Sequence, residues 1–182
     1  MRDDASYGLG LKNMTVSLAE PNTLWQQAYA NEAQAIRQVL GDIAIDMQHV
    51  GSTAIPGIKA KPIIDILVGV KHLDDGPRCI GAMEAIGYDY AGSDIVPDDH
   101  IFGRGIKNES RTHLVHVVEY RGDNWNRMIA FRDALRSDVG LARAYEQLKV
   151  GLAGEHAESR AQYTKAKQAF IDEVVMASGL GQ

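Results

Sequence analysis

The sequence predicts an α+β fold, in which a small mixed β-sheet is flanked by helices and followed by a helical C-terminal half. Residues 43–49 alternate between apolar and polar side chains, the period of a half-buried strand. Residues 62–70 are almost continuously apolar, as expected of a central strand that is covered on both faces. Residues 112–120 form another strand, and from residue 123 onward the pattern is helical.

The helices are predicted from spacing and from residues that start or stop a helix. Asn22 is a good N-cap for a first helix that ends at Gly41. Its apolar residues recur at spacings of three and four and are Trp25, Tyr29, Ala33, Ile36 and Leu40. Residues 75–86 form a second helix, and three more lie near residues 124–136, 138–153 and 156–177. Residues 88–90 start an edge strand or a loop, and residues 91–111 are expected to form a mobile loop.

A chain of 182 residues is expected to form one domain with a real core. We expect residues 1–15 to be a loose leader, residues 16–176 to form the domain and residues 177–182 to be a short tail. The single cysteine, Cys79, excludes an internal disulfide and favours a role in the core.

The composition predicts a soluble cytoplasmic protein, with 45% hydrophobic and 24% charged residues. No signal-like apolar segment and no membrane-spanning run occur, so no membrane partner is expected. The net charge of −5 argues against a broad basic surface for nucleic acid. It leaves room for a small basic pocket that binds one nucleotide or phosphorylated small molecule, and no feature sets an oligomeric state.

A tight turn at Gly51 and Ser52, followed by Thr53, is the first candidate binding element. A turn with free backbone N–H groups can hold phosphate oxygens, and the Ser52 hydroxyl can add a further contact. The alternative is an ordinary turn in which Ser52 caps the next segment. The position of the turn just before a buried strand that carries a carboxylate favours phosphate binding.

Asp65 is the strongest single candidate, because it is a carboxylate in the middle of an apolar strand. Such a group is costly to bury unless a metal ion or a cation pairs with it. Asp65 is therefore a candidate Mg²⁺ ligand and catalytic residue, since Mg²⁺ prefers oxygen donors. The alternative is a structural carboxylate paired with Lys61 or an arginine. Lys61 is itself a candidate for contacting phosphate and assisting catalysis.

The strand at residues 112–120 offers two alternating sets of polar side chains. His113 and Glu119 share one face, and His116 lies on the other, so Glu119 and His116 cannot both reach Asp65 unless a bulge intervenes. His116 is a candidate base, Glu119 a second candidate metal ligand, and His113 and His49 candidates for lining the cleft. Each of these residues can instead be structural.

Basic residues supply the remaining candidates. Arg104, Lys107 and Arg111 lie in or near the expected loop and are either phosphate clamps or solvated charges. Arg132, Lys149 and Lys167 recur at internal helix positions and either line a cleft that faces the sheet or lie at the surface.

The chain resembles the GrpB-like family of the nucleotidyltransferase superfamily over roughly residues 16–172. The resemblance rests on two long blocks, residues 49–57 (HVGSTAIPG) and 61–68 (KPIIDILV). It continues through residues 111–113 (RTH), 116–119 (HVVE), 131–136 (FRDALR) and 148–149 (LK), and it includes Trp25, Trp125, Tyr145 and Tyr163.

This resemblance implies a nucleotidyltransferase fold with the Gly51-Ser52 turn and Asp65 in the active cleft. Enzymes of that superfamily hold a nucleoside triphosphate on the turn and bind two Mg²⁺ ions with paired carboxylates. Here Leu67 stands where the second carboxylate would be. The departure puts two-metal nucleotidyl transfer in question, because one carboxylate cannot supply the usual ligands unless Glu119, Asp94, Asp98 or Asp99 contributes.

Three functional hypotheses follow. The first is a Mg²⁺-dependent nucleotidyl- or phosphotransferase that acts on a small molecule or a protein. The second is a catalytically weakened regulatory module that binds a nucleotide, a phosphorylated metabolite or a metal, as Leu67 suggests. The third is a transition-metal site formed by His49, His113 or His116 with Asp65.

Overall fold

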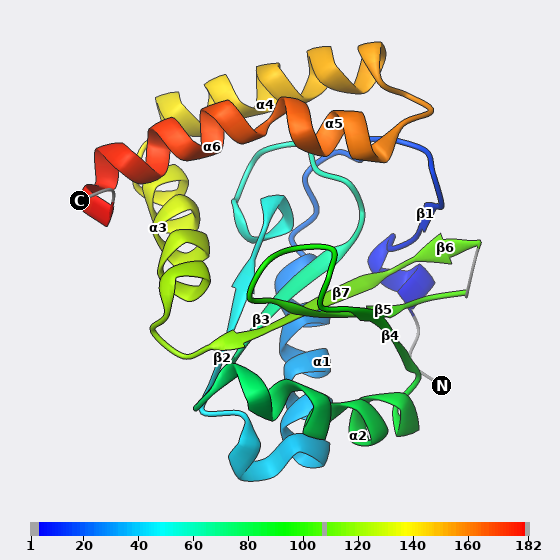
Figure 1. The fold of residues 1–182 in the computed structure, drawn as a ribbon. Coiled ribbons are helices and arrows are strands. Elements are labelled where there is room, and N and C mark those ends of the chain that lie inside the picture. The colour runs from blue at the N-terminus through cyan, green and yellow to red at the C-terminus, as the bar shows by residue number, and fades with distance from the viewer. Residues whose placement is uncertain (1–3, 107–108, 181–182) are drawn as a thin grey trace.

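The computed structural model describes residues 4–106 and 109–180 and has an α+β architecture. A five-stranded mixed sheet lies between two layers of helices (Figure 1). The strands of this sheet are β2 (Asp46–Val50), β3 (Ile64–Val70), β4 (Tyr88–Gly92), β5 (His100–Arg104) and β7 (His113–Glu119). The helices are α1 (Trp25–Leu40), α2 (Ile80–Ala85), α3 (Asp123–Ser137), α4 (Val139–Glu155), α5 (Arg160–Ala166) and α6 (Gln168–Val175).

The sheet has the strand order β2-β3-β7-β5-β4, and its only parallel pair in the described part of the chain is β3 with β7. A parallel pair needs a long crossover connection, and the chain between these two strands passes through α2, β4 and β5. The central position of β3 explains its composition, because side chains on both of its faces meet other layers.

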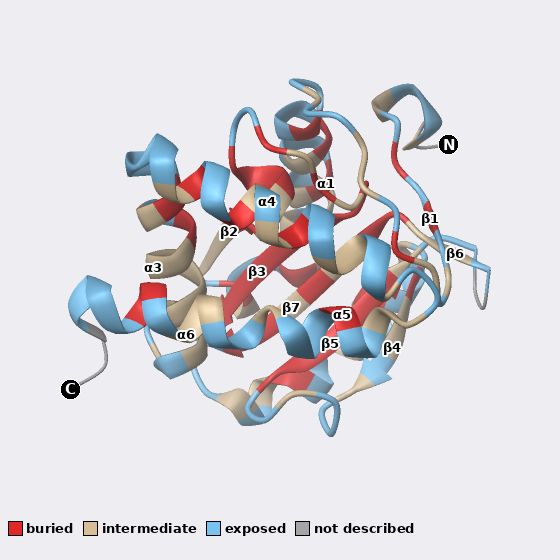
Figure 2. Ribbon diagram, turned by 90° about the horizontal axis from the view of Figure 1, so that it is seen from above, coloured by how far each residue is buried: buried red, intermediate tan, exposed pale blue. Residues whose placement is uncertain are grey.

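Two packing layers cover the sheet. On one face, which we call the α1 face, Ile64, Ile66 and Val68 pack against α1 and α2. On the other, which we call the Asp65 face, Leu67 and Val118 pack against Trp125 of α3. Figure 2, seen from the side of α4, α5 and α6, shows buried strands beneath these helices and exposed residues on their outer surfaces.

The first helix agrees with its predicted register, and its start differs in detail. Trp25, Ile36 and Leu40 are buried on the side that faces the sheet. The backbone N–H of Leu24 donates to the Asn22 side chain, 2.9 Å away, so Asn22 forms a turn just before the helix. The expected strand at residues 43–49 begins only at Asp46, because the chain first makes a turn of 3₁₀ helix at Gly41–Ile43.

The prediction of a loop across residues 91–111 is wrong, because β5 lies within it and fills the place between β7 and β4. This strand is five residues long and includes Gly103, so its sequence shows no clear alternation. The expected helix at residues 156–177 is two helices, α5 and α6, which meet at Lys167.

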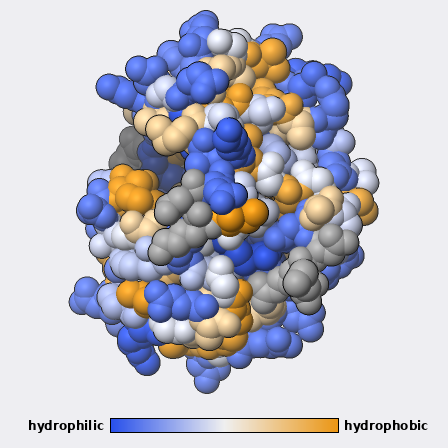
Figure 3. Space-filling view, turned by 90° about the vertical axis from the view of Figure 1, so that its right-hand side faces the viewer, coloured by the Kyte–Doolittle hydropathy of each residue, from blue (hydrophilic) through white to orange (hydrophobic). Residues whose placement is uncertain are grey.

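The N-terminal segment is held by specific contacts. Leu11 and Lys12 form the short strand β1 (Leu11–Lys12), which pairs with β6 (Ser110–Arg111). The Asp4 carboxylate accepts two hydrogen bonds, each of 2.9 Å, from Arg104. The side of the molecule on which β1 and β6 lie is mostly hydrophilic, with hydrophobic residues in small separate patches (Figure 3).

Candidate functional site

Asp65 is a partly exposed residue on the sheet face that the C-terminal helices cover. In the register of β3 and β7, Asp65 pairs with Leu114 and Leu67 pairs with His116, so all four side chains share the Asp65 face. Asp65, Leu114 and His116 are partly exposed, whereas Leu67 is completely buried. The C-terminal helices therefore cover this face incompletely around Asp65.

The predicted turn lies directly against Asp65. Gly51 adopts φ 68° and ψ −174°, a conformation that only glycine takes readily. A Cβ atom at Gly51 would lie 2.1 Å from Oδ2 of Asp65. Ser52 follows and lies near the side chain of Tyr145 in α4. The pairing of β2 with β3 and the packing of α4 thus bring the turn, the carboxylate and Tyr145 together, as the sequence predicted for the first two.

Two lysines approach Asp65 across the ring of Tyr163. The Lys61 Nζ atom lies 5.3 Å from the ring centroid and the Lys167 Nζ atom 4.5 Å from it. Burial lowers the pKa of Lys61, although the charge of Asp65 opposes this shift. Burial and the neighbouring Lys61 lower the pKa of Lys167 to about 7. Both amines therefore lie where a negative charge would favour their protonated forms.

Two further cations border the same region. The Lys149 Nζ atom lies 4.9 Å from the ring centroid of Tyr145 and donates to the backbone carbonyl of Lys59. Burial lowers the pKa of Lys149 to about 7. Burial also lowers the pKa of Arg160, and the charge of Arg111 adds to this effect. Positive charge is thus concentrated around a single carboxylate.

The surroundings of Asp65 shift its pKa in two opposite directions. Burial raises its pKa, and the charges of His116, Lys61, Lys167 and Arg160 act in the opposite direction. Each of these groups is close enough to Asp65 to interact with it electrostatically. The group we call the Asp65 site consists of Gly51, Ser52, Lys61, Asp65, Asp99, His116, Tyr145, Lys149, Arg160, Tyr163 and Lys167.

His116 is held by a buried carboxylate. Its Nδ1 atom lies 2.6 Å from Oδ2 of Asp99, a residue with 0% exposure just before β5. Burial disfavours the charged imidazole, but the hydrogen bond and charge of Asp99 and the charge of Asp65 together raise the pKa of His116. Because Nδ1 is engaged by Asp99, Nε2 is the ring nitrogen that makes no hydrogen bond to a described residue.

Three residues that the sequence predicted for the site are His49, Thr53 and Arg132. They pack around the Gly51-Ser52 turn. The ring of His49 stacks on Tyr29 with centroids 4.7 Å apart, and its Nε2 atom lies 3.0 Å from the Thr53 hydroxyl. Burial, with the charges of Arg136 and Arg132, lowers the pKa of His49 to about 3. Arg132 donates to the backbone carbonyl of His49. His49, Thr53 and Arg132 therefore support the turn and do not face Asp65.

Arg104 and His113 lie on the opposite, α1 face of the sheet. Arg104 donates to Glu32, 3.0 Å away, and to His113 Nδ1, 2.9 Å away, as well as to Asp4. Glu32 is 2% exposed. The predicted phosphate clamp is thus an arginine engaged in a buried structural network.

Arg111 lies at the edge of the Asp65 face. It forms two hydrogen bonds to Asp89, of 2.5 and 2.6 Å, and its guanidinium lies over Gly103. Gly103 pairs with Leu114, which in turn pairs with Asp65. Arg111 thus borders the site while paired with a carboxylate. The other loop candidate, Lys107, lies outside the described residues.

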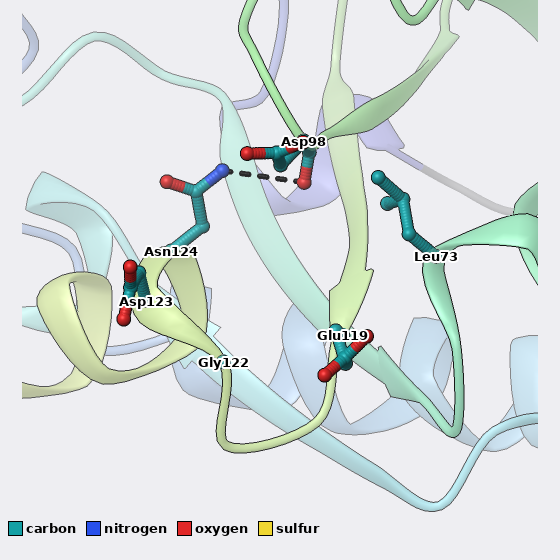
Figure 4. A pocket seen from close by; sticks show the side chains of 6 residues that line it. All are labelled: Leu73, Asp98, Glu119, Gly122, Asp123 and Asn124. Carbon is teal, nitrogen blue, oxygen red and sulfur yellow. Dashed lines mark hydrogen bonds between the residues drawn. The ribbon is translucent and has the colours of Figure 1, made fainter.

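Glu119 does not join Asp65. It pairs with Val70, five positions along β3, which is about 16 Å away at about 3.3 Å per residue. Figure 4 shows it at the end of β7, in a pocket of about 200 Å³ with Leu73, Asp98, Gly122, Asp123 and Asn124. Among the described residues no group of three or more His, Cys, Asp or Glu side chains could hold a metal ion.

The fold does not place Glu119 beside Asp65, so the two candidate metal ligands do not form one site. Asp65 faces several cations, and the next carboxylate, Asp99, is bonded to His116. Of the three histidines considered for a transition metal, His116 shares the face of Asp65, whereas His49 and His113 lie on the α1 face.

Tyr145, Tyr163 and Arg160 escaped prediction as functional residues, and Asp99 was considered only as one of several further carboxylates. Tyr145 and Tyr163 each stand one helical turn before a lysine of the site, and this spacing is the signal that could have found them. Asp99 lies just before a strand that the sequence did not reveal, and Arg160 begins a helix whose start was placed four residues too early. Neither of these two carries a local signal.

Comparisons with known proteins give a consistent result. A family model described as GrpB protein matches residues 15–176. The glutamate-rich protein GrpB of Alkalihalophilus pseudofirmus is 36% identical over 92% of this chain and 98% of its own length. The UPF0157 protein YqkA of Bacillus subtilis is 34% identical over 82% of this chain, which spans 43% of that longer protein.

A solved structure supports the same assignment. The crystal structure of conserved protein GrpB from Enterococcus faecalis matches with a TM-score of 0.80 and 32% identity, over 89% of this chain and 96% of that one. In the described part of the chain no helix is long and apolar enough to cross a membrane. The match of one family model to most of the sequence, together with these relatives, shows that the chain belongs to the GrpB family.

Proposed function

We propose that this chain binds a phosphorylated small molecule or nucleotide at the Asp65 site. The observation that carries the proposal is the concentration of Lys61, Lys167 and Arg160 around one partly exposed carboxylate. Phosphate oxygens accept hydrogen bonds from such groups and offset their mutual repulsion.

Polar atoms at the site support a polar ligand. The hydroxyl of Tyr163, Oδ1 of Asp99 and Nε of Arg160 are three of the five buried side-chain polar atoms in the described residues that have no hydrogen-bond partner. Buried polar groups are rarely left in this state, so their grouping around one site is informative. The Gly51-Ser52 turn adds backbone N–H groups at the edge of the same site.

The proposal can be tested by calorimetric titration with pyrophosphate in the presence of a chelator. We expect binding, and we expect Lys167→Met to weaken it at least about tenfold, the effect of losing about 1.4 kcal/mol. Lys165→Met is the matched control, since Lys165 is an exposed lysine in the last turn of α5, two residues before Lys167. No heat with pyrophosphate, ADP or ATP, or an equal effect of both substitutions, would contradict the proposal.

The Asp65→Asn variant distinguishes direct binding of phosphate by the cations from binding of a nucleotide through a metal ion. If phosphate meets the cations directly, removing the negative charge of Asp65 strengthens pyrophosphate binding in chelator. If Asp65 instead holds Mg²⁺ for a nucleotide, as the resemblance implies, the same change weakens ATP binding that depends on Mg²⁺. Because several cations act on Asp65, we expect the first result, stronger pyrophosphate binding.

Nucleotidyl or phosphoryl transfer to a small-molecule or protein acceptor is a second candidate function. The pairing of His116 with buried Asp99 favours it, because this is how a reactive imidazole is oriented. A regulatory module that binds without turnover is the alternative, supported by Leu67 at the second carboxylate position. Release of pyrophosphate or of a nucleoside diphosphate from ATP, abolished in His116→Gln, would separate transfer from binding alone.

A further inference from the structure

We infer that Nε2 of His116 is a nucleophile that accepts a phosphoryl group from a ligand bound at the Asp65 site, forming a phosphohistidine. The inference rests on the proposed phosphate binding and adds the chemistry of transfer. It depends on three observations, which are the orientation of the ring, the access to Nε2 and the charge around it.

The orientation comes from Asp99. The 2.6 Å contact between Nδ1 of His116 and Oδ2 of Asp99 places the proton of the neutral ring on Nδ1. The lone pair is then on Nε2, which forms no hydrogen bond with any described residue. A carboxylate that orients a histidine in this way recurs where the other ring nitrogen acts as a base or a nucleophile.

Access follows from the place of His116 in the sheet. It shares the Asp65 face with Leu67 and Leu114, and its side chain is 16% exposed while its partner Asp99 is enclosed. The partly exposed region around Asp65 is where the ligand binds in the proposed function. The imidazole therefore borders the space that a phosphate would occupy.

The charge around His116 comes from two carboxylates, Asp99 and Asp65, and from the cations that act on Asp65. Lys61, Lys167 and Arg160 interact with Asp65, and Asp65 interacts with His116. Cations at this place neutralise the oxygens of a phosphoryl group, so that an incoming lone pair is not repelled.

The step is a simple displacement at phosphorus. With acetyl phosphate as the donor, the Nε2 lone pair forms a bond to phosphorus as the bond from phosphorus to the acetate oxygen breaks. Acetate leaves with the electron pair as a stable carboxylate and needs no proton. The Nδ1 proton stays in its hydrogen bond with Asp99, whose charge balances the positive ring of the product.

The test is to incubate the full chain with acetyl phosphate and to map phosphorylated residues by mass spectrometry under alkaline conditions, in which a bond from phosphorus to nitrogen survives. We expect phosphorylation at His116, and none at His72, which is exposed, or at His156. His116→Gln removes the modification and His156→Gln, the matched control, keeps it. Modification of Ser52, Asp65 or a lysine in place of His116, or equal modification of all accessible histidines, overturns the inference.

Failure of this inference and failure of the proposed function are distinguishable. Pyrophosphate binding of the unmodified wild-type chain is measured in parallel. If the chain binds pyrophosphate and is not phosphorylated at His116, only the nucleophile is wrong. If it neither binds nor is phosphorylated, the phosphate site itself is wrong. Because the wild-type chain is mapped directly, neither result depends on whether a variant folds.

Discussion

Gly51 and Asp65 fit against each other so closely that a single added carbon atom on Gly51 would lie 2.1 Å from the Asp65 carboxylate. The turn and the carboxylate come from two segments separated by 13 residues, and the antiparallel pairing of β2 with β3 brings them together. Val50, the residue before the turn, pairs directly with Asp65. The contact joins the two sequence blocks that first suggested a site.

Gly51→Ala is expected to lower the free energy of unfolding by about 2–4 kcal/mol, from backbone strain together with the clash at Asp65. Gly57→Ala is the control, because Gly57 also has positive φ, 77°, but no atom lies within 4 Å of the added carbon. That change is expected to cost only about 1–2 kcal/mol. Urea denaturation measures the free energy of unfolding of both variants. Equal losses would show that the clash with Asp65 does not contribute to the cost of Gly51→Ala.

Lys167→Met is expected to stabilise the free protein by about 1–4 kcal/mol while weakening pyrophosphate binding. The folded state lowers the pKa of Lys167 to about 7, below its ordinary 10.5, so folding favours the neutral amine. For the wild-type chain this contribution to stability therefore rises as pH increases from about 7 toward 10.5.

The methionine variant lacks this titration. Its gain over wild type should be largest at pH 6 and should shrink steadily above pH 7. Thermal unfolding of both proteins across this range, at low salt and without phosphate, checks the prediction. A difference that stays constant at all pH values would mean that the pKa of Lys167 is the same in the folded and unfolded chains.

Binding of sulfate, whose charge is constant above pH 6, is expected to weaken as pH rises through 7. Lys149 and Lys167 both have pKa values of about 7 and are then losing the protons that attract the anion. The loss is up to about tenfold per pH unit for each proton taken up on binding. Calorimetry from pH 6 to 9 measures the slope, which should be shallower in Lys167→Met and unchanged in Lys165→Met.

Arg104→Met is expected to destabilise the protein by about 3–5 kcal/mol, because it leaves Glu32 as a buried charge without its arginine partner. Arg78→Met is the control, since Arg78 pairs with Asp75 at the surface with a 66% exposed side chain. Its expected cost is at most about 1 kcal/mol.

Pyrophosphate affinity provides the second measurement for the arginine variant. Arg104 lies on the α1 face, so the folded Arg104→Met protein should bind pyrophosphate like the wild type. A large loss of pyrophosphate affinity in a variant that remains folded would show that Arg104 contributes to phosphate binding, as the sequence predicted.

The two strands that carry the site could be predicted because their patterns are local. The apolar run of β3 predicts a covered central strand whatever its neighbours are, and Asp65 stands out within it. The alternation in β7 also separates His116 from His113 and Glu119 without any tertiary information. Strand β5 could not be found in this way, because its five residues show no period and it owes its place to the strands on either side.

The roles of the basic residues could not be predicted from local sequence patterns. Arg104, Lys149 and Lys167 look alike in the sequence, as single cationic residues with no charged neighbour on either side. Their roles differ because of what the fold places beside them, which is Glu32 and Asp4 for Arg104 and Tyr145 or Tyr163 for the lysines. Charge partners far apart in the chain leave no local pattern.

The sequence by itself thus determined the α+β class, the Gly51-Ser52 turn and the placement of Asp65 and His116 on their strands, since backbone conformation and side-chain alternation are local properties. Only the tertiary structure decided that Asp65 is surrounded by cations and not by a second carboxylate, and that Asp99 holds His116. Both results depend on strand order and on the docking of α4 and α5 over the sheet, where groups far apart in the chain come close enough to interact electrostatically.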